Sequence, residues 1–530
     1  MIPFNIPYYN DNCIENIKLT YNYGIQSGDG EFSKKCEKFF QEKYNFKKTL
    51  LLPSCTHALE MMAMLLDIKE NDEIIIPSYT FVSTANAFVK FGAKIICVDS
   101  MADNPNIDAN EIKKNITSNT KAICVVHYGG WSCDMDTIVK ICQDNNIILL
   151  EDAAQAIHSY YKNKPLGSFG AMSTFSFHET KNINCGEGGL LIINDSKYIE
   201  RGEIIREKGT NRSSFFKGEI SKYEWIDKGS SYLLSDILAA YLYPQLEDID
   251  NIILHRKELW KTYHENMKKL ECYNYFKVCY EHDNCIGNYH IFYLLFNSTD
   301  KLKIIKNLLK NNDILSTTHY IPLHLSKYYK KHFEEISLTN SEKFGTSILR
   351  LPLYNNLTIK DAEYISNIIT NYLKDNLYYI KDKHLNNEDK ELIVQLKTQF
   401  WNFSKDSQLE WINKNIKEND IHILLYDNNN NNNKILIGYG VIMKRNCNII
   451  DSIIIDEKYR NKGYGGTLIK SVTEYIQDSG FLLCEKHNIN FYEKYGWSRN
   501  NDIKIFGKDI KNNLYKMTYN FNANFVSYIL

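Results

Sequence analysis

Lys181 lies between a strand-like run at 174–177 and a glycine-rich turn, Cys185-Gly186-Glu187-Gly188-Gly189. Glycines permit close backbone approach and unusual backbone angles. A lysine held in such a place and partly desolvated has a lowered pKa and can form a Schiff base with a carbonyl group. Taken alone, however, Lys181 is better explained as a solvated surface charge, as most lysines are.

Two further features indicate a cofactor site. Asp152 follows the apolar run at 147–150, and a carboxylate at the carboxyl end of a strand can pair with a protonated ring nitrogen, as pyridoxal phosphate requires. Residues 53–60, PSCTHALE, open a predicted helix with small hydroxyl residues, and the free N–H groups of such a helix N-terminus suit a phosphate. Each feature alone fits an ordinary surface acid or helix cap, but the three together predict one site.

In this order the motifs resemble the DegT/DnrJ/EryC1 family, fold-type I aminotransferases that act on nucleotide sugars. The resemblance covers roughly residues 1–375. Four runs are similar to those of the transaminases that make dTDP-4-amino-4,6-dideoxygalactose: 77–87 (PSYTFVSTANA), 176–182 (SFHETKN), 206–212 (REKGTNR) and 319–324 (HYIPLH). The resemblance implies pyridoxal 5′-phosphate (PLP) as cofactor, L-glutamate as amino donor and a nucleotide-linked 4-keto-6-deoxyhexose, aminated at C4, as acceptor.

The resemblance also implies roles for individual residues. Lys181 would hold the cofactor covalently and move the proton, and Asp152 would pair with the ring nitrogen. The other cofactor-binding side chains would be Cys55, Thr56 and Ser176 at the phosphate, Phe81 on the ring and Gln155 near its O3′. The substrate-binding side chains would be His178, His319 and Tyr320. A lysine at 181, where a subset of this fold has histidine, favours transamination over removal of a hydroxyl group.

One position departs from the family pattern. Many relatives carry asparagine two residues after a glycine, where it reaches the phosphate of the neighbouring subunit. Ser231 occupies that position here, two residues after Gly229. The family forms dimers with shared sites, so the resemblance implies a homodimer and leaves the role of Ser231 open.

A second set of motifs lies nearer the carboxyl end. The run 460–465, RNKGYG, follows a strand-like run and opens a predicted helix, where N–H groups and the helix dipole suit a pyrophosphate. A lone glycine-rich turn is more often a plain turn. Together with 491–497, FYEKYGW, it resembles the GNAT acetyltransferases over about 390–520.

The second resemblance implies acetyl-CoA as cosubstrate. The residues expected to bind its pyrophosphate are Arg460, Lys462, Gly463 and Gly465. Asn488 would contact the cofactor, Tyr492 would protonate the leaving CoA thiolate, and backbone N–H groups near Ile454 would hold the thioester carbonyl. Glu485 is a candidate general base but is better explained as a surface glutamate. No residue identifies the amine that is acetylated.

The elements that must position these residues follow a βαβ pattern. Short β-branched runs at 73–76, 94–98, 122–126 and 147–150 alternate with amphipathic stretches, which predicts a mainly parallel sheet with helices on both faces. Functional residues of such sheets lie beyond the carboxyl ends of the strands. The expected fold class is α/β: a fold-type I PLP-dependent transferase with a small α+β subdomain, followed by an α/β GNAT domain.

Changes in composition and pattern along the chain predict the domain boundaries. We expect a large PLP-binding domain at 1–240, a small aminotransferase domain at 241–375, a polar linker at 376–390 and the GNAT domain at 391–530. We also expect one helical stretch from Glu391 to Ile416 at the start of the GNAT domain.

The whole-chain composition excludes several classes of protein. A length of 530 residues with 44% apolar residues predicts about three globular domains. A net charge of −1 argues against nucleic acid as the main partner. Thirteen scattered cysteines without a C-x-x-C pair fit reduced thiols better than disulfides or a zinc site. With no signal-peptide pattern and no apolar run long enough to span a bilayer, we expect a cytoplasmic enzyme without a metal or a membrane partner.

These features together predict a bifunctional enzyme that makes a 4-amino-4,6-dideoxy sugar nucleotide and then N-acetylates the new amine. One alternative is a transaminase whose acetyltransferase domain acts on an unrelated amine, and another is a non-catalytic sugar-nucleotide-binding protein. Intact Lys181, Asp152 and the turn at Arg460 argue against the last. The sequence leaves open dTDP or UDP, the galacto or gluco configuration of the amine, and the final glycan.

Overall fold

The structure is a computed structural model that describes residues 1–273, 275–377, 379–382, 385–427, 435–445, 448–476, 480–499 and 514–519. The chain divides into two compact units. The first consists of Met1–Asn266 and Val278–Ile365, and the second of Met267–Lys277 and Ser366–Leu530.

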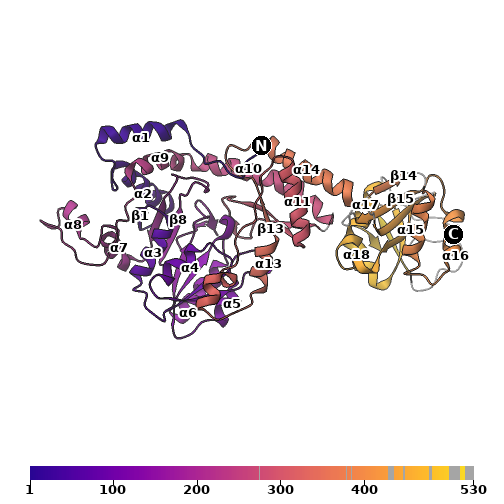
Figure 1. Ribbon diagram of the computed structural model, residues 1–530, viewed down its shortest axis with the longest axis horizontal. Coiled ribbons are helices and arrows are strands. Elements are labelled where there is room, and N and C mark those ends of the chain that lie inside the picture. Colours follow the sequence, from indigo (N-terminus) through magenta and orange to yellow (C-terminus); the bar gives the residue numbers. More distant parts are fainter. Residues whose placement is uncertain are drawn as a thin grey trace. The chain divides into compact units, whose positions relative to one another are not determined.

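A seven-stranded sheet of order β1-β9-β8-β5-β4-β2-β3 forms the centre of the first unit (Figure 1). Its strands are β1 (Lys48–Leu52), β2 (Glu73–Pro77), β3 (Lys94–Val98), β4 (Thr120–Val126), β5 (Ile148–Asp152), β8 (Met172–Ser176) and β9 (Gly189–Ile193). β3, β2, β4, β5 and β8 run parallel, and β9 is antiparallel to both of its neighbours. The four β-branched runs therefore form β2 to β5, which confirms the mainly parallel sheet.

Helices cover both faces of this sheet. α3 (Cys55–Leu65) and α4 (Ser83–Val89) share one core with Leu50, Ile74 and Leu150. The alternate strand residues are buried as well, because successive side chains of a strand point to opposite faces. The other helices of this part are α1 (Asp11–Tyr23), α2 (Glu31–Tyr44), α5 (Ala109–Lys114), α6 (Met135–Asn145), α7 (Ile199–Arg206), α8 (Arg212–Phe216), α9 (Asp236–Glu247) and α10 (Ile249–Lys268).

Two small sheets are formed mainly by residues of the first unit. One has the order β10-β12-β13, and the other has the order β11-β6-β7. Their strands are β6 (Tyr160–Tyr161), β7 (Lys164–Pro165), β10 (Phe276–Val278), β11 (Cys285–Ile286), β12 (Phe292–Phe296) and β13 (Ile348–Leu351). The helices that accompany them are α11 (Thr299–Asn311), α12 (Lys327–His332) and α13 (Thr339–Ser347), followed by α14 (Ile359–Leu377).

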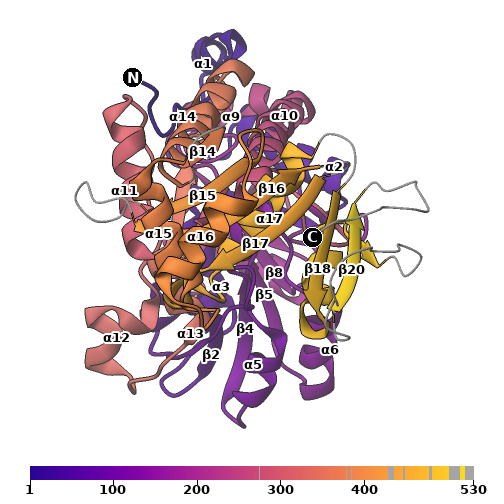
Figure 2. The same cartoon turned by 90° about the vertical axis from the view of Figure 1, so that its right-hand side faces the viewer.

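A second seven-stranded sheet, of order β14-β15-β16-β17-β18-β20-β19, forms the second unit (Figure 2). Its strands are β14 (Tyr379–Asp382), β15 (Ile421–Asp427), β16 (Ile435–Lys444), β17 (Asn448–Ile455), β18 (Gly480–Glu485), β19 (Ser498–Arg499) and β20 (Leu514–Tyr519). β17 and β18 are parallel, and the other paired strands are antiparallel. β14 and the start of the next helix lie within 376–390, where a linker was expected.

Helices also lie on both faces of the second sheet. α15 (Asn387–Lys397) and α16 (Lys405–Asn415) share one core with Leu424 and Tyr439, whereas α17 (Tyr464–Tyr475) shares another with Ile423 and Ile442 (Figure 2). A short helix, α18 (Ile489–Glu493), follows β18. Among the described residues, no helix combines the length and the apolar composition needed to cross a bilayer.

The expectation of one helical stretch from Glu391 to Ile416 is wrong, because the structure has two helices there. α15 ends at Lys397, and α16 starts anew after Ser404, whose hydroxyl accepts a hydrogen bond from the backbone N–H of Ser407 at 3.2 Å. Side chains of this kind favour helix N-termini because they satisfy free N–H groups. Apolar periodicity alone does not register such an internal cap.

A close backbone approach at Gly189 joins the sheet to the start of α3. Gly189 pairs with Leu52 of β1 and with Ser176 of β8. A Cβ at this glycine would lie 2.3 Å from the backbone nitrogen of Cys55. Because β9 is hydrogen-bonded on both sides, neither backbone can move away, and only glycine permits this contact.

We expect Gly189→Ala to lower the free energy of unfolding by about 3 kcal/mol or more, since the clash is between backbone atoms. Gly186→Ala is the matched control in the same turn: its φ is 79° but no atom lies within 4 Å of the new Cβ, so it should lose only about 1 kcal/mol through backbone strain. Urea unfolding of the two variants measures the difference. Equal losses would contradict the close approach.

Candidate active sites

The first cavity lies beyond the carboxyl ends of the parallel strands and has a volume of about 310 Å³. It contains every residue predicted for the aminotransferase site except Ser231. These are Cys55, Thr56, Phe81, Asp152, Gln155, Ser176, His178, Lys181, His319 and Tyr320. Ser231 is exposed and lies outside the lining. The sheet thus gathers side chains that are separated by up to 265 positions in the sequence.

One end of this cavity is built from hydroxyl groups at two helix N-termini. Ser54 caps α3 by accepting a hydrogen bond from the backbone N–H of His57 at 3.1 Å. The Thr56 hydroxyl lies 2.8 Å from the Ser83 hydroxyl at the start of α4. Burial raises the pKa of the Cys55 thiol to about 12, so it stays protonated and donates to Thr174. Free N–H groups and neutral hydroxyls suit a phosphate.

Asp152 and Lys181 form the charged part of the cavity. The Asp152 carboxylate accepts hydrogen bonds from the Thr84 hydroxyl at 2.7 Å and from the backbone N–H of Ala154 at 3.2 Å. Burial raises the pKa of Asp152 and lowers the pKa of Lys181, while the attraction between the two groups opposes both shifts. The site therefore holds a carboxylate able to pair with a protonated ring nitrogen and an amine shifted toward its nucleophilic, neutral form.

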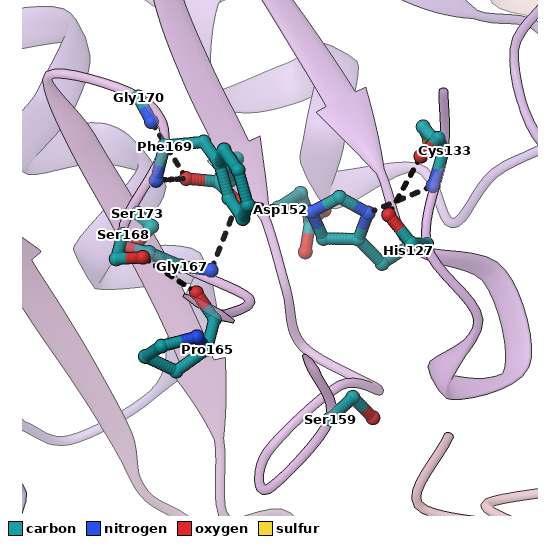
Figure 3. A network of polar contacts seen from close by, with 12 residues as sticks. His127, Cys133, Asp152, Ser159, Pro165, Gly167, Ser168, Phe169, Gly170 and Ser173 are labelled. Carbon is teal, nitrogen blue, oxygen red and sulfur yellow. Dashed lines mark hydrogen bonds and ion pairs between the residues drawn. The ribbon is translucent and has the colours of Figure 1, made fainter. Parts of the chain in front are cut away.

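The neighbouring carboxylate, Glu151, points to the opposite face of the sheet and has a structural role there. Its oxygens accept backbone N–H bonds from Gly167, Phe169 and Gly170 at 2.7–2.8 Å. His127 Nε2 lies 3.0 Å from Glu151, and the other side of its ring faces Cys133 (Figure 3). The backbone N–H of Cys133 donates to His127 Nδ1, so Nε2 is the ring nitrogen whose proton is donated to Glu151.

Gln155 connects two walls of the cavity. Its side-chain oxygen accepts a hydrogen bond from the backbone N–H of Gly129 at 2.7 Å, and its nitrogen donates to the Tyr320 hydroxyl at 2.8 Å. The His319 ring stacks on Tyr320 with the centroids 3.6 Å apart, and His319 Nδ1 lies 2.6 Å from the Tyr128 hydroxyl. Burial lowers the pKa of His319 well below its usual range, so this ring is neutral.

Two predicted residues lie nearer the open side. The Phe81 side chain is 55% exposed, and its ring centroid lies 6.1 Å from that of Tyr320. His178 Nε2 lies 3.7 Å from the Glu187 carboxylate. Ser83 and Arg350 also line the cavity, although the sequence analysis did not select them. A usable signal existed for Arg350, because it is the one charged residue in the run 348–351, ILRL.

The second cavity lies where β17 and β18 separate, and its volume is about 1010 Å³. The two strands pair only up to Ile450 and Leu482. Beyond that point both strands line the cavity, so β17 has no partner there on the β18 side. Of the predicted acetyltransferase residues, the lining contains Arg460, Gly463, Gly465, Asn488 and Tyr492. Lys462 is exposed outside the lining, with its amine 5.3 Å from the Tyr459 ring centroid.

The turn before α17 lets an anion come close to the backbone at the helix N-terminus. Gly463 has a φ of 89° and begins the helix without a side-chain cap, so its helix N–H groups stay available for an anion. The Arg460 guanidinium lies 4.3 Å from the Phe400 ring centroid. At the other end, Tyr492 is buried, and burial raises the pKa of its phenol, which therefore remains protonated and able to donate a proton.

A polar chain that the sequence analysis missed also reaches the second cavity. The Lys397 amine donates to the Ser452 hydroxyl at 3.1 Å, and Ser452 donates to the Asp451 carboxylate. Ser452 has a φ of 57° at an irregularity where the β16–β17 register shifts. Glu485, the earlier candidate base, is 67% exposed and lies 3.3 Å from His487.

Comparisons with known proteins match two separate parts of the chain. Residues 9–370 match the DegT/DnrJ/EryC1/StrS aminotransferase family, and residues 390–497 match the acetyltransferase (GNAT) family. "Uncharacterized protein MJ1066" of Methanocaldococcus jannaschii is 35% identical over 353 residues, which are 64% of this chain and 90% of that protein.

Solved structures share the fold of the first match. PseC of Helicobacter pylori, an aminotransferase involved in the biosynthesis of pseudoaminic acid, is 26% identical with a TM-score of 0.65 over 70% of this chain and 99% of its own. The putative sugar aminotransferase Spr1654 of Streptococcus pneumoniae, in its PMP form, is 24% identical with a TM-score of 0.66 over 71% of this chain and 98% of its own, which shows the common fold.

The two carboxylates at the end of β5 should respond oppositely to neutralisation. We expect Glu151→Gln to lower the free energy of unfolding by about 2–4 kcal/mol, because the amide cannot replace an acceptor of several N–H bonds. Asp152→Asn should leave the stability of the cofactor-free protein equal or higher at neutral pH. The folded state raises the pKa of Asp152, so its ionised form is destabilising above the unfolded pKa.

Urea unfolding at neutral pH measures the stability of both variants. PLP titration followed by absorbance measures how each substitution changes cofactor binding. Asp152→Asn should weaken PLP binding, whereas any Glu151→Gln protein that stays folded should bind PLP normally. A large loss of stability in Asp152→Asn together with normal PLP binding would contradict the assignment of the two carboxylates.

Proposed function

The chain belongs to the DegT/DnrJ/EryC1/StrS aminotransferase family, and from that premise we propose that it aminates and then acetylates one sugar. It is a PLP-dependent aminotransferase joined to a GNAT N-acetyltransferase that uses acetyl-CoA. The observation that carries the proposal is chemical: a primary amine is what the first site makes and what the second site consumes. Joining both sites in one chain raises the effective concentration of the intermediate.

In the first step, the amino group of L-glutamate is transferred to C4 of a dTDP- or UDP-linked 4-keto-6-deoxyhexose. The likeness to PseC, whose name links it to pseudoaminic acid, supports a sugar substrate. So do the sequence runs at 77–87, 206–212 and 319–324, which are similar to those of the transaminases that make dTDP-4-amino-4,6-dideoxygalactose. His178, His319 and Tyr320 then face the substrate.

The residues of the first cavity fit PLP, which supplies an electron sink for the electrons of the broken C–H bond. Lys181 would hold the cofactor and would take up and release a proton at its amine, a role that the lowered pKa of this buried amine favours. Asp152 would pair with the ring nitrogen, and Gln155 would lie near O3′. The hydroxyls of Thr56, Ser83 and Ser176, together with the N–H groups at Cys55, would receive the phosphate, and Phe81 would cover the ring.

The aminotransferase part works as a homodimer in this proposal. A large domain at 1–240 and a small domain at 241–375 form the aminotransferase part of each subunit, and Ser231 reaches the phosphate of the neighbouring subunit. α8 projects from the first unit (Figure 1), and the segment that follows it exposes Trp225 to 80% and Ile226 to 49%. Exposed large apolar side chains in this segment support its use as part of the dimer interface.

In the second step, the GNAT domain, 391–530, transfers an acetyl group to the new amine. Arg460, Lys462, Gly463 and Gly465 bind the pyrophosphate of acetyl-CoA, and Asn488 contacts the cosubstrate. The backbone of β17 near Ile454 holds the thioester carbonyl, and Tyr492 protonates the departing thiolate. Because nucleotide sugars and acetyl-CoA are both cytoplasmic metabolites, we place the enzyme in the cytoplasm.

Product masses test the proposal directly. The purified protein is incubated with PLP, L-glutamate and the dTDP- or UDP-linked 4-keto-6-deoxyglucose, and acetyl-CoA is then added. We expect an amino sugar first and its N-acetyl derivative second, with one nucleotide preferred. An absent amino sugar contradicts the first step, and an amino sugar that never gains an acetyl group shows that the second domain acts on another amine.

Single substitutions should separate the two activities. We expect Lys181→Ala to abolish amination and to leave acetylation of a supplied 4-amino sugar unchanged. Tyr492→Phe should slow acetylation by about 10²-fold, the usual contribution of a general acid, and should leave amination unchanged. The two reactions are assayed separately on the full-length variants, and loss of both activities in either variant would contradict independent sites.

A further inference from the structure

Arg350 is fixed in the middle of β13 and lines the first cavity. Its backbone pairs with Tyr293 of β12 on one side and bridges to Thr317 on the other, with N–H···O distances of 2.7 and 3.2 Å. Its Nε is buried and has no hydrogen-bond partner among the described residues. A paired strand therefore places the Arg350 guanidinium in the lining of the cavity, where its Nε–H donor has no acceptor in the part of the protein described.

Two other arginines of the first unit show what the fold does with buried guanidinium groups. Arg206 forms ion pairs with Glu37 and Asp29. Arg256 donates to three backbone carbonyls and to Asn355. For Arg350, the described part of the chain offers no ion pair and no side-chain hydrogen bond. A charge left in this state is costly unless a ligand completes it.

The carboxylates that line the same cavity, Asp152 and Glu187, form no ion pair with Arg350 among the described residues. Asp152 accepts from Thr84 and Ala154, and Glu187 is 67% exposed beside His178. Burial lowers the pKa of the Arg350 guanidinium, and the phenols of Tyr79, Tyr128 and Tyr320 counteract this shift. Because arginine stays protonated at any working pH, the cavity contains a cation that lacks an anion.

The surroundings of Arg350 locate this cation near the reacting lysine. Lys181, His319 and Arg350 all line this one cavity, and the charge of Arg350 lowers the pKa of both Lys181 and His319. The Phe4 ring lies 4.8 Å from the guanidinium carbon. The hydroxyl groups suited to a phosphate belong to other elements than Arg350. They lie at the N-termini of α3 and α4, whereas Arg350 lies on β13.

We propose that Arg350 binds the α-carboxylate of the amino donor. This inference rests on the proposed function, in which an amino acid supplies the nitrogen at Lys181. The α-carboxylate is bonded to the same carbon as that nitrogen, so it must lie close to Lys181 during transfer. The pyrophosphate of a nucleotide sugar is attached at C1, across the hexose ring from C4, and lies farther away. An arginine fork also matches a carboxylate in bidentate geometry.

Separate half-reactions test the assignment on the full-length, PLP-loaded protein. We expect Arg350→Gln to lower kcat/KM for L-glutamate by at least about 30-fold, mainly through KM, because a buried charged partner is lost. The half-reaction with the nucleotide keto sugar should stay within about threefold of the wild type, and Arg350→Lys should recover part of the lost activity. Arg201→Gln is the matched control, since Arg201 is paired with Asp67 and Asp227 outside the cavity.

Two readouts separate ligand binding from general damage. Calorimetric titration with 2-oxoglutarate, without any sugar, should show binding to the wild type and to Arg201→Gln but at least about 30-fold weaker binding to Arg350→Gln. L-Glutamate 1-amide, which lacks the α-carboxylate, should react equally slowly with the wild type and with Arg350→Gln. Thermal melts establish that the variants are folded.

The alternative results overturn the inference in distinct ways. A loss confined to the keto-sugar half-reaction would mean that Arg350 binds a phosphate of the nucleotide. Unchanged binding of 2-oxoglutarate by Arg350→Gln would mean that the guanidinium takes no donor. If the wild type reacts with L-glutamate and depends on Arg350 but accepts no 4-keto sugar, the proposed sugar substrate fails while the donor site stands.

Discussion

The burial of two adjacent carboxylates at the end of β5 is the constraint on which the first site depends. A strand turns Glu151 and Asp152 to opposite faces of the sheet, and an unpaired charge in the interior is strongly unfavourable. The fold satisfies Glu151 completely, with three backbone N–H groups and His127. It satisfies Asp152 only in part, through Thr84 and Ala154. The incomplete side is the one that faces the cavity, so the charge remaining there is available to a bound group.

The positively charged side chains of the cavity likewise lack a full set of partners within the described segments of the protein. Lys181 is desolvated without being neutralised, and Arg350 lacks the carboxylates and carbonyls that the fold supplies to Arg206 and Arg256. In the second cavity, backbone groups in place of charged side chains are left available to a ligand. There β17 and β18 stop pairing after Ile450, which leaves strand N–H groups for a ligand in place of a neighbouring strand.

Particular residues show how far sequence reasoning reached. The runs at 73–76, 94–98, 122–126 and 147–150 are strands as predicted, because β-branched residues in short apolar stretches suit a sheet buried on both faces. The motif residues selected around Lys181 meet in one cavity. The sequence analysis missed Ser83, Arg350 and Lys397, whose partners come from distant parts of the chain, and it merged α15 and α16 across the cap at Ser404.

The order of residues by itself determined the fold class, the two regions that contain the candidate sites and most of the side chains that line them, since these depend on local periodicity and on short motifs. The tertiary structure alone decided which of two neighbouring carboxylates remains available, and which arginine lacks a partner. Sequence lists donors and acceptors without showing which of them meet. Whether a buried charge is satisfied depends on every group within a few ångströms, and only the folded chain brings those groups together.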